Sequence, residues 1–311
     1  MSNKHIFFTI SIVLSIISAQ PSSNGRDLNL EYFGTVENLN IQGFDVVGNR
    51  LYGIFPGTNN SGQNAAQLSI VDITTLEIIS TLNEGTPEAG GWWGYPWKIE
   101  VFDNIVVVPG DGGYVFFDVS DDVIQYLGND LIVSGFLFNS PMHTFKKGNY
   151  LYSAIASTGF GVYDMTDPLN PVTVHEHDYE SDDYPYGIYA DDNYVIICDV
   201  ENDGRIVIHE NGGNFSELGQ ISQATDRAAT HGNYLFTIST NTWKIYDISD
   251  PANPVTVAVH DDMEDLANGE MKIYGDYLLL SSGDAGSGKA SVYDISDYQN
   301  IELVLDLDED L

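Results

Sequence analysis

One short pattern recurs along this chain of 311 residues, and it limits the possible folds more than any other feature of the sequence. A strand-like segment ends in an aspartate, and a polar turn follows. The clearest copies are Tyr163-Asp-Met-Thr-Asp-Pro168 and Tyr246-Asp-Ile-Ser-Asp-Pro251. The equivalent positions elsewhere are Asp72, Asp118 and Asp294, with a degenerate copy at Val207–Glu210. The copies lie roughly 45 residues apart, with one shorter step, and a fixed period of this length indicates stacked structural repeats.

A second pattern, a two-residue turn flanked by apolar alternation, interleaves with the first. These turns are Gly48-Asn49, Asp103-Asn104, Gly148-Asn149, Asp192-Asn193, Gly232-Asn233 and Gly275-Asp276. Dipeptides of this kind tolerate positive φ and close tight hairpins, and each precedes a strand-like segment such as Tyr150–Ile155. Each repeat is therefore predicted to contain four strands: two joined by the tight turn, a third after a variable loop, and a fourth after the aspartate turn.

Four antiparallel strands at this period, without helical periodicity, are typical of a propeller blade. Six copies predict an all-β fold, a six-bladed β-propeller of four-stranded antiparallel blades that forms one domain over residues 21–311. Asn29–Val36 and Ile301–Leu307 both resemble the outer strand of a blade. We expect six blades with the two ends of the chain meeting in one blade; the alternatives are a surplus strand or a missing seventh blade.

The segments "YDMTDPLNPVTV" (Tyr163–Val174) and "YDISDPANPVTV" (Tyr246–Val257), with the preceding "GNYLY" and "GNYLF", resemble LVIVD repeats. The likeness covers about residues 28–311, and it is most specific in the third and fifth repeats. Proteins with these repeats are exported microbial propellers. The resemblance therefore implies a propeller in an extracellular setting, and it implies no particular activity.

The first 20 residues predict a secretory signal peptide. Lys4 and His5 precede the apolar run Ile6–Ile17, and Ser18-Ala19 offers small residues for cleavage. The run is short for a transmembrane helix, although an uncleaved N-terminal anchor is the alternative. No later segment is long and apolar enough to span a membrane, so we expect no transmembrane segment in the mature chain. The predicted location is secreted or at the cell surface.

The formal net charge of −35, with only 11 Lys and Arg residues, excludes several classes of partner. Nucleic acids and anionic membranes need clustered cations, so neither is expected. The acidity suits a salt-rich medium or carboxylate-bound divalent cations. Cys198, the single cysteine, lies in a predicted buried strand and cannot form an intramolecular disulfide. We expect a monomer that binds an unknown extracellular ligand or protein.

Two motifs that suggest chemistry have better structural explanations. Gly283–Ser291, "GDAGSGKAS", approaches a phosphate-binding loop, but such a loop must open a helix, whereas a predicted strand follows Lys289. The position after Lys289 that would hold Mg²⁺ is Ala290. The repeated aspartates recur in separate blades, which places them around a ring rather than in one cluster. We expect them to accept backbone N–H groups in their turns.

A calcium site is the candidate cofactor site. Its ligands would be Asp199, Glu201, Asp203 and Glu210, which approach the spacing of a twelve-residue calcium loop around Gly204. The alternative is a plain Asn-Asp-Gly hairpin turn. A second candidate is the pair His175 and His177, which share one face of a predicted outer strand; no third metal ligand is evident near them, so solvated histidines are the alternative.

Aligning the first strands of the repeats on their turns gives the candidate binding site. The first strand of a blade lines the central axis, so residues at one level should meet at one channel mouth. This level gathers Trp97, Lys98, His143, Tyr186, Arg227 and Glu270. The functional interpretation is a polar, aromatic-rimmed pocket for an anionic or sugar-like ligand. In the structural interpretation, Glu270 neutralises Arg227 or Lys98, and the aromatic residues close the channel.

The loop Gly90–Trp97 before this level holds three tryptophans, which suggests a binding surface or a loop folded over the mouth. The sequence therefore predicts a non-enzymatic ligand- or protein-binding or scaffold module that acts through one channel mouth. The alternative is a hydrolase or lyase that uses His143 and Glu270 as general acid and base, with Arg227 or Lys98 steadying an anion. A structural surface component with a sealed mouth is the third possibility.

Overall fold

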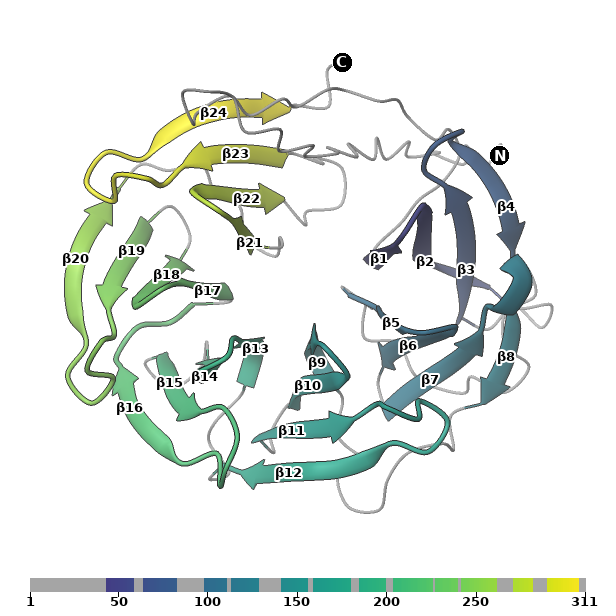
Figure 1. The fold of residues 1–311 in the computed structure, drawn as a ribbon, viewed down its shortest axis with the longest axis horizontal. Coiled ribbons are helices and arrows are strands. Elements are labelled where there is room, and N and C mark those ends of the chain that lie inside the picture. The colour runs from purple at the N-terminus through teal and green to yellow at the C-terminus, as the bar shows by residue number, and fades with distance from the viewer. Residues whose placement is uncertain are drawn as a thin grey trace, which may run out of the picture.

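The computed structural model describes most of the chain after residue 42 as a ring of six four-stranded sheets (Figure 1). The described residues are 43–58, 64–82, 98–110, 113–128, 141–155, 159–179, 185–199, 204–225, 227–239, 242–261, 271–281 and 290–307. Within each sheet, the strands follow one another in chain order and pair antiparallel. The predicted six-bladed β-propeller is therefore confirmed.

Each blade runs from an inner strand beside the central axis to an outer strand at the rim (Figure 1). The inner strands are β1 (Gly43–Val47), β5 (Glu100–Phe102), β9 (Pro141–Lys147), β13 (Pro185–Ala190), β17 (Arg227–His231) and β21 (Met271–Tyr274). The second strands are β2 (Arg50–Thr58), β6 (Ile105–Gly110), β10 (Tyr150–Ile155), β14 (Tyr194–Asp199), β18 (Tyr234–Ser239) and β22 (Tyr277–Ser281).

The third strands are β3 (Asn64–Asp72), β7 (Gly113–Asp118), β11 (Gly159–Asp164), β15 (Arg205–Glu210), β19 (Thr242–Asp247) and β23 (Ala290–Asp294). The outer strands are β4 (Glu77–Thr81), β8 (Gln125–Gly128), β12 (Val172–Asp178), β16 (Glu217–Ile221), β20 (Val255–His260) and β24 (Glu302–Leu307). One short 3₁₀ helix, η1 (Ser120–Asp122), follows β7.

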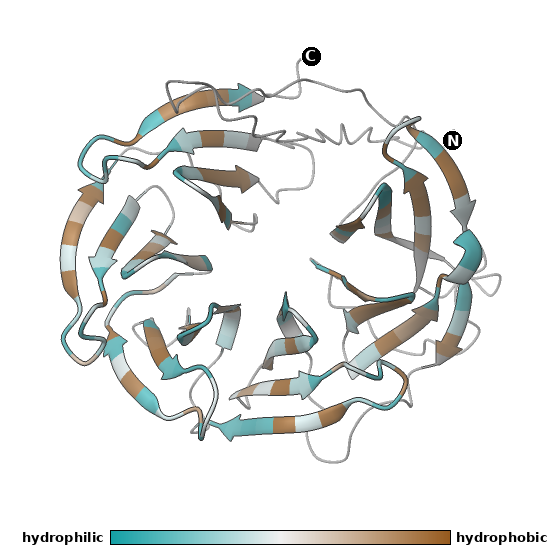
Figure 2. Ribbon diagram, viewed as in Figure 1, coloured by the Kyte–Doolittle hydropathy of each residue, from teal (hydrophilic) through white to brown (hydrophobic). Residues whose placement is uncertain are grey.

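The core lies between neighbouring blades. One cluster joins Ile54 and Leu68 of the first blade to Val106 and Phe117 of the second. Because both faces of a second or third strand pack against other blades, these strands are apolar on both faces, as β11 is over Phe160–Tyr163. The outer strands alternate instead, which Figure 2 shows as bands of brown and teal around the rim.

The predicted tight turns are present in five blades. There the first turn residue has positive φ, from 51° at Asp103 to 61° at Gly48 and Gly232, which glycine adopts without strain. The fourth blade differs, because its strand pairing ends at Ala190 and Val195 and leaves a longer loop. Asp191 closes that loop by accepting the backbone N–H groups of Asn193 and Tyr194, each at 2.7 Å.

The repeated aspartates act as turn residues, as the sequence predicts. Each accepts the backbone N–H of the residue two positions later at 2.8 or 2.9 Å; they are Asp72, Asp118, Asp164, Asp247 and Asp294. In the first copy, the hydroxyl and then the amide of Thr74 hold the pKa of the Asp72 carboxyl below its usual value. The second aspartate of the motif makes a further turn: Asp250 accepts from the Ala252 amide and from the Asn253 side chain.

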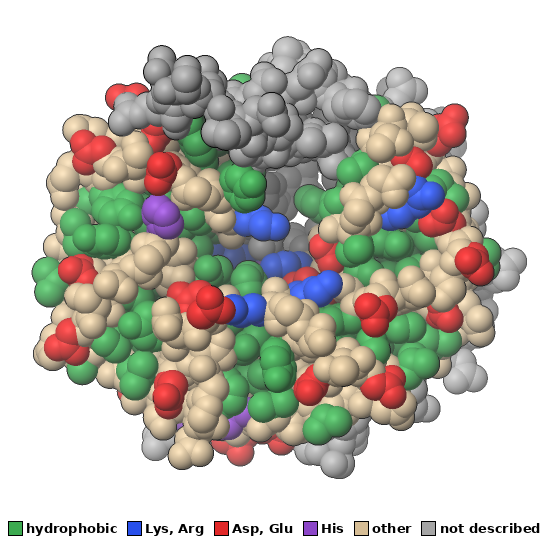
Figure 3. All heavy atoms as spheres, in the orientation of Figure 1, with side chains coloured by type: hydrophobic (Ala, Val, Ile, Leu, Met, Phe, Trp, Pro, Cys, Tyr) green, Lys and Arg blue, Asp and Glu red, His purple; other side chains and the backbone are tan. Residues whose placement is uncertain are grey.

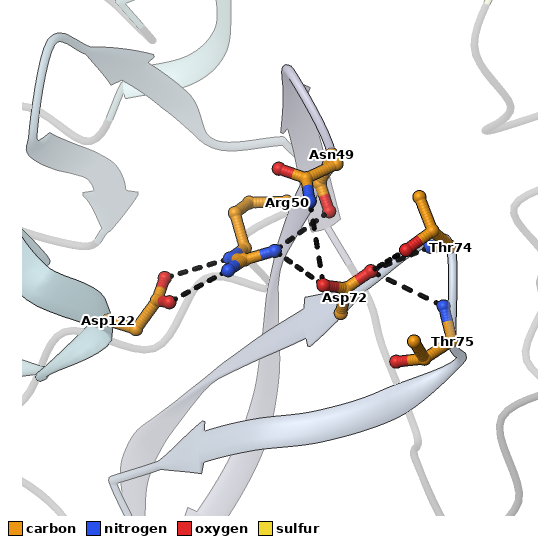
Figure 4. A network of polar contacts seen from close by, with 6 residues as sticks. All are labelled: Asn49, Arg50, Asp72, Thr74, Thr75 and Asp122. Atoms are coloured by element: carbon orange, nitrogen blue, oxygen red, sulfur yellow. Dashed lines mark hydrogen bonds and ion pairs between the residues drawn. The ribbon is translucent and has the colours of Figure 1, made fainter.

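Arg50 connects the first two blades (Figure 4). Its Nη1 lies 2.7 Å from Asp72 Oδ2, while Nε and Nη2 each lie 2.9 Å from an oxygen of Asp122 in η1. This bidentate contact fixes both the distance and the orientation between the blades. Asp121 and Asp122 adopt positive φ, which aims the carboxylate of Asp122 back at the first blade.

The sixth blade is completed by its own outer strand, because β24 pairs with β23. The expectation that Ile301–Leu307 forms an outer strand is confirmed, whereas Asn29–Val36 and the predicted signal peptide lie outside the described residues. Within the described part of the chain, no helix is long and apolar enough to cross a membrane.

Candidate ligand site at the central channel

The inner strands surround a central opening, and lysine and arginine side chains gather around it (Figure 3). The cations on these strands, or directly before one, are Lys98, Lys146, Lys147, Arg227 and Lys272. The other described cations, Arg50, Arg205 and Lys244, lie on second or third strands. A chain with a net charge of −35 thus places most of its described cations beside the channel.

Strand pairing places the predicted residues at one level. Gly43, His143, Gly187 and Arg227 pair with Ile54, Ala154, Cys198 and Ile238, which occupy equivalent positions on the second strands. Tyr186 is the extra residue of a β-bulge in β13, since Pro185 and Gly187 pair with consecutive residues. A bulge re-aims a side chain relative to its strand, so Tyr186 does not follow the alternation of its neighbours.

Lys98 extends from the second blade toward the third. Its Nζ lies 3.5 Å from Glu100 Oε1 and 4.9 Å from the ring centroid of Phe145 on β9. Glu100 is 4% exposed and also accepts the backbone N–H of Lys146 at 3.0 Å. One buried carboxylate therefore both balances Lys98 and joins β5 to β9.

Lys146 is held differently, by neutral partners. Its Nζ donates to the Val101 carbonyl oxygen and lies 4.9 Å from the ring centroid of Phe102. A carbonyl oxygen and an aromatic face orient an ammonium group without neutralising it. Lys147, next in the strand, has a carboxylate partner in Asp192 of the following blade.

Arg227 begins β17 and is 9% exposed, whereas Lys272 on β21 is exposed. Arg227 therefore lies within the wall of the channel, and Lys272 offers its ammonium group to solvent. Among the described residues, no carboxylate forms an ion pair with Lys272.

His143 is part of the contact between the third and fourth blades. It is 3% exposed, and its Nδ1 lies 3.1 Å from the carbonyl oxygen and 3.3 Å from the amide nitrogen of Ile188 on β13. The ring is therefore engaged with the neighbouring backbone. Trp97 and Glu270 lie outside the described residues. Of the predicted acid–base pair of His143 and Glu270, the structure therefore describes His143 alone.

Lys146, Lys147 and Lys272 are channel residues that the one-level alignment of the sequence missed. They stand two to four residues closer to their turns than Lys98 and Arg227 do. Comparing all six inner strands for cations at every level, rather than at one, would have found them.

The candidate calcium loop needs a correction. Asp199 pairs with Arg205 and Glu210 pairs with Tyr194, so these two carboxylates stand at opposite ends of the β14–β15 hairpin. Five residue steps along a strand separate them by about 16 Å, which is too far for one ion. Glu210 cannot complete the site, because it lies at the far end of the extended strand β15, whereas a helix would return it toward the loop. Glu201 and Asp203 lie outside the described residues.

His175 and His177 share one face of β12, as predicted, but they pack against the fourth blade. The ring centroid of Phe160, on β11 of the same blade, lies 5.5 Å from that of each histidine. The ring centroid of His209 of the fourth blade lies 5.0 Å from that of His177. No group of three metal ligands is found in the described part of the chain.

The remaining motifs take the structural roles predicted for them. Ala290–Asp294 is strand β23, so "GDAGSGKAS" leads into a strand as predicted; its residues before Ala290 lie outside the described part. Cys198 is 1% exposed within β14, which fits a small apolar residue of the core.

No protein-family model matches the sequence, and no curated protein matches it. Solved structures with the same fold include a periplasmic gluconolactonase of Pseudomonas aeruginosa, with a TM-score of 0.62 and 11% identity over 89% of this chain and 88% of that one. A hypothetical selenium-binding protein of Sulfolobus tokodaii gives a TM-score of 0.60 and 11% identity over 83% of this chain and 75% of that one. A Bacteroides fragilis protein that carries the assignment of 6-phosphogluconolactonase gives a TM-score of 0.55 and 12% identity over 85% of this chain and 83% of that one. At these identities the likeness shows a shared propeller fold and nothing finer.

Proposed function

We propose that this chain is an exported, non-enzymatic propeller that binds a ligand or a partner protein through one mouth of its central channel. The observation that carries the proposal is the placement of Lys98, Lys146, Lys147, Arg227 and Lys272 around the channel of a strongly acidic chain. Exposed cations elsewhere would relieve the self-repulsion of the acidic surface equally well, so their gathering at one place supports a binding role.

Export and membership of the LVIVD-repeat family belong to the same proposal. They rest on the apolar run Ile6–Ile17 and on the repeated "NPVTV" segments at Asn170–Val174 and Asn253–Val257. Asp167 and Asp250 give those segments a structural meaning, since each caps its turn by accepting from the asparagine three residues later. The motif thus encodes the turn before the outer strand in the third and fifth blades.

Hydrogen–deuterium exchange of the full chain tests the channel proposal. The probes are trigalacturonic acid, citrate, tripolyphosphate and the neutral trisaccharide maltotriose, each at millimolar concentration. A bound probe should slow exchange in peptides that contain β9 and β17, while peptides from β12 and β20 at the rim stay unchanged. Protection confined to the rim, or no protection with any probe, would contradict the proposal.

The second candidate function is a hydrolase or lyase acting at the same mouth. Two structural neighbours are named as lactonases, which favours testing a lactone first. Glucono-δ-lactone hydrolysis by the wild-type chain and by His143→Asn separates the two functions. A rate above the uncatalysed reaction that disappears in the variant would establish the enzyme. A wild-type rate equal to that of the uncatalysed reaction supports the binding proposal, consistent with the engagement of His143 with Ile188.

A further inference from the structure

Within the part of the chain that the structure describes, the inner strands carry more cations than carboxylates. Their described carboxylates are Asp45 and Glu100. Asp45 accepts the Val101 amide at 2.9 Å and the Val46 amide at 2.8 Å, and Glu100 accepts the Lys146 amide. Both carboxylates are thus committed to backbone N–H groups, and only Glu100 also meets a cation.

Two of the channel cations have no carboxylate partner among the described residues. Lys146 contacts a carbonyl oxygen and an aromatic face, and Lys272 forms no ion pair within the described part of the chain. An ammonium group beside a low-dielectric wall attracts an anion more strongly than one on an open surface does. The carbonyl and ring contacts also hold Lys146 in place before any ligand arrives.

The sixfold arrangement sets the strands that carry these cations opposite one another. Lys146 comes from the third blade and Lys272 from the sixth, and their strands β9 and β21 face each other across the opening (Figure 1). The second and fifth blades, which carry Lys98 and Arg227, oppose each other in the same way. Lys146 and Lys272 stand two or three residues nearer their turns, which separates the two levels by about 7 to 10 Å along the strands.

From this arrangement we infer that the channel binds an organic ligand with two or more anionic groups, held between Lys146 and Lys272. The inference rests on the proposed channel function and names the chemical class of its ligand. A single anionic group can meet only one side of the opening, whereas a ligand with charges at both ends meets opposed cations at once. Phe145, which already contacts Lys98 and is only partly buried, offers apolar surface to the carbon skeleton between the charges.

Isothermal titration calorimetry on the full chain tests the ligand class. The probes are trigalacturonic acid as an acidic sugar, citrate as a free polycarboxylate, tripolyphosphate as a phosphate, galacturonic acid as a single charge, and neutral maltotriose. At least one multivalent anion should bind more than tenfold more tightly than galacturonic acid or maltotriose. The best of the three multivalent probes identifies the source of the charge.

Variants tie the binding to the two lysines. Lys146→Gln and Lys272→Gln should each raise the Kd of the best probe at least tenfold, while Lys146→Arg and Lys272→Arg should restore it to within about threefold. Lys244→Gln is the matched control, because it removes the same charge from the third strand β19 and should change the Kd less than twofold. Thermal melts confirm that each variant folds.

The outcomes separate this inference from the proposed function. Maltotriose could bind as tightly as the anions, protect β9 and β17 from exchange, and keep the same Kd in both lysine variants. In that case the channel function stands and the anionic ligand class is wrong. If the glutamine variants behave like Lys244→Gln, the inference is overturned. If none of the probes binds, both proposals fail.

Discussion

Two junctions between blades use the same architecture with different chemistry. The histidine junction, between the third and fourth blades, consists of Phe160, His175, His177, Tyr179, His209 and Phe215. The tryptophan junction, between the fifth and sixth blades, consists of Phe236, Trp243, Tyr293 and Tyr298. In both, aromatic rings from third strands meet those of the neighbouring blade.

The difference is the titratable group at the centre. His209 is fully buried, with its Nδ1 2.9 Å from the Phe215 carbonyl oxygen and its Nε2 2.8 Å from the Tyr179 hydroxyl. At the centre of the tryptophan junction, Trp243 lies edge-on to Tyr293 at 4.6 Å; the imidazoles there, His231 and His260, are only half-buried and contact Tyr298. The histidine junction therefore has a buried titratable ring at its centre, whereas the buried ring at the centre of the tryptophan junction does not titrate.

The largest effect should come from removing a buried aromatic ring from either junction. Trp243 is 1% exposed and Phe160 is fully buried. Trp243→Ala and Phe160→Ala should each lower the free energy of unfolding by about 3–5 kcal/mol, because each leaves a cavity that rigid β-sheets fill poorly. Urea denaturation followed by tryptophan fluorescence or circular dichroism measures both. A loss below about 1 kcal/mol in either variant would show that the ring is not part of a packed core.

Acid should separate the two junctions. Burial above all, together with the nearby His177 and His175, lowers the pKa of His209 from its usual 6.5 to about 4, against the opposing effects of the Phe215 carbonyl and Glu217. The unfolded chain therefore binds a proton near pH 6.5 that the folded chain binds only near pH 4. The free energy of unfolding is therefore highest above pH 6.5, and it falls by up to about 3 kcal/mol as the pH falls toward 4.

His209→Gln supplies the test of that origin. Glutamine keeps a donor and an acceptor near Phe215 and Tyr179 but does not titrate. Between about pH 7 and pH 4, its unfolding free energy should fall less steeply than that of the wild type or of Trp243→Phe, its control in the other junction. Parallel curves for all three proteins would mean that His209 does not cause the acid sensitivity.

The repeat made the fold predictable, and particular residues show why. Gly148 and Gly232 predict the tight turns between first and second strands, and Asp164 and Asp247 predict the turns after the third strands. Both kinds of residue act on backbone within a few positions of themselves. The fourth blade departs from the rule, because Asp191 also accepts a hydrogen bond from Thr230 of the fifth blade. That contact is nonlocal, and the sequence of one repeat does not reveal it.

The site was predictable only in part, for the same reason. The sequence alignment brought Lys98, His143 and Arg227 to one level, but it did not reveal that His143 is bound to the backbone of the next blade. Lys146 and Lys272 were missed because their importance depends on which blades oppose each other in the closed ring. The pair His175 and His177 was recognised, whereas their partner His209 comes from another repeat.

A smaller effect should follow from removing the hydroxyl beside His209. Tyr179→Phe leaves His209 Nε2 buried without its partner, which should cost about 1–2 kcal/mol at pH 7. Tyr298→Phe is the matched variant, because its hydroxyl lies 3.0 Å from His231 Nδ1 at a half-buried position where water can replace it. Its cost should stay below about 1 kcal/mol. Equal losses in the two variants would remove the distinction between a buried and a half-buried imidazole.

The smallest effect should be shared by both regions, because the third and fifth blades use the same aspartate turn. Asp167 and Asp250 each accept a backbone amide at 3.2 Å and an asparagine side chain at 2.9 Å, in exposed turns. Asp167→Ala and Asp250→Ala should therefore each lower the free energy of unfolding by less than about 1 kcal/mol, because water replaces exposed partners readily. The two losses should be equal. Thermal melts at pH 7 measure both. A difference of more than a few degrees between their Tm values would mean that the junctions act on the turns as well, and that the blades are not equivalent outside their cores.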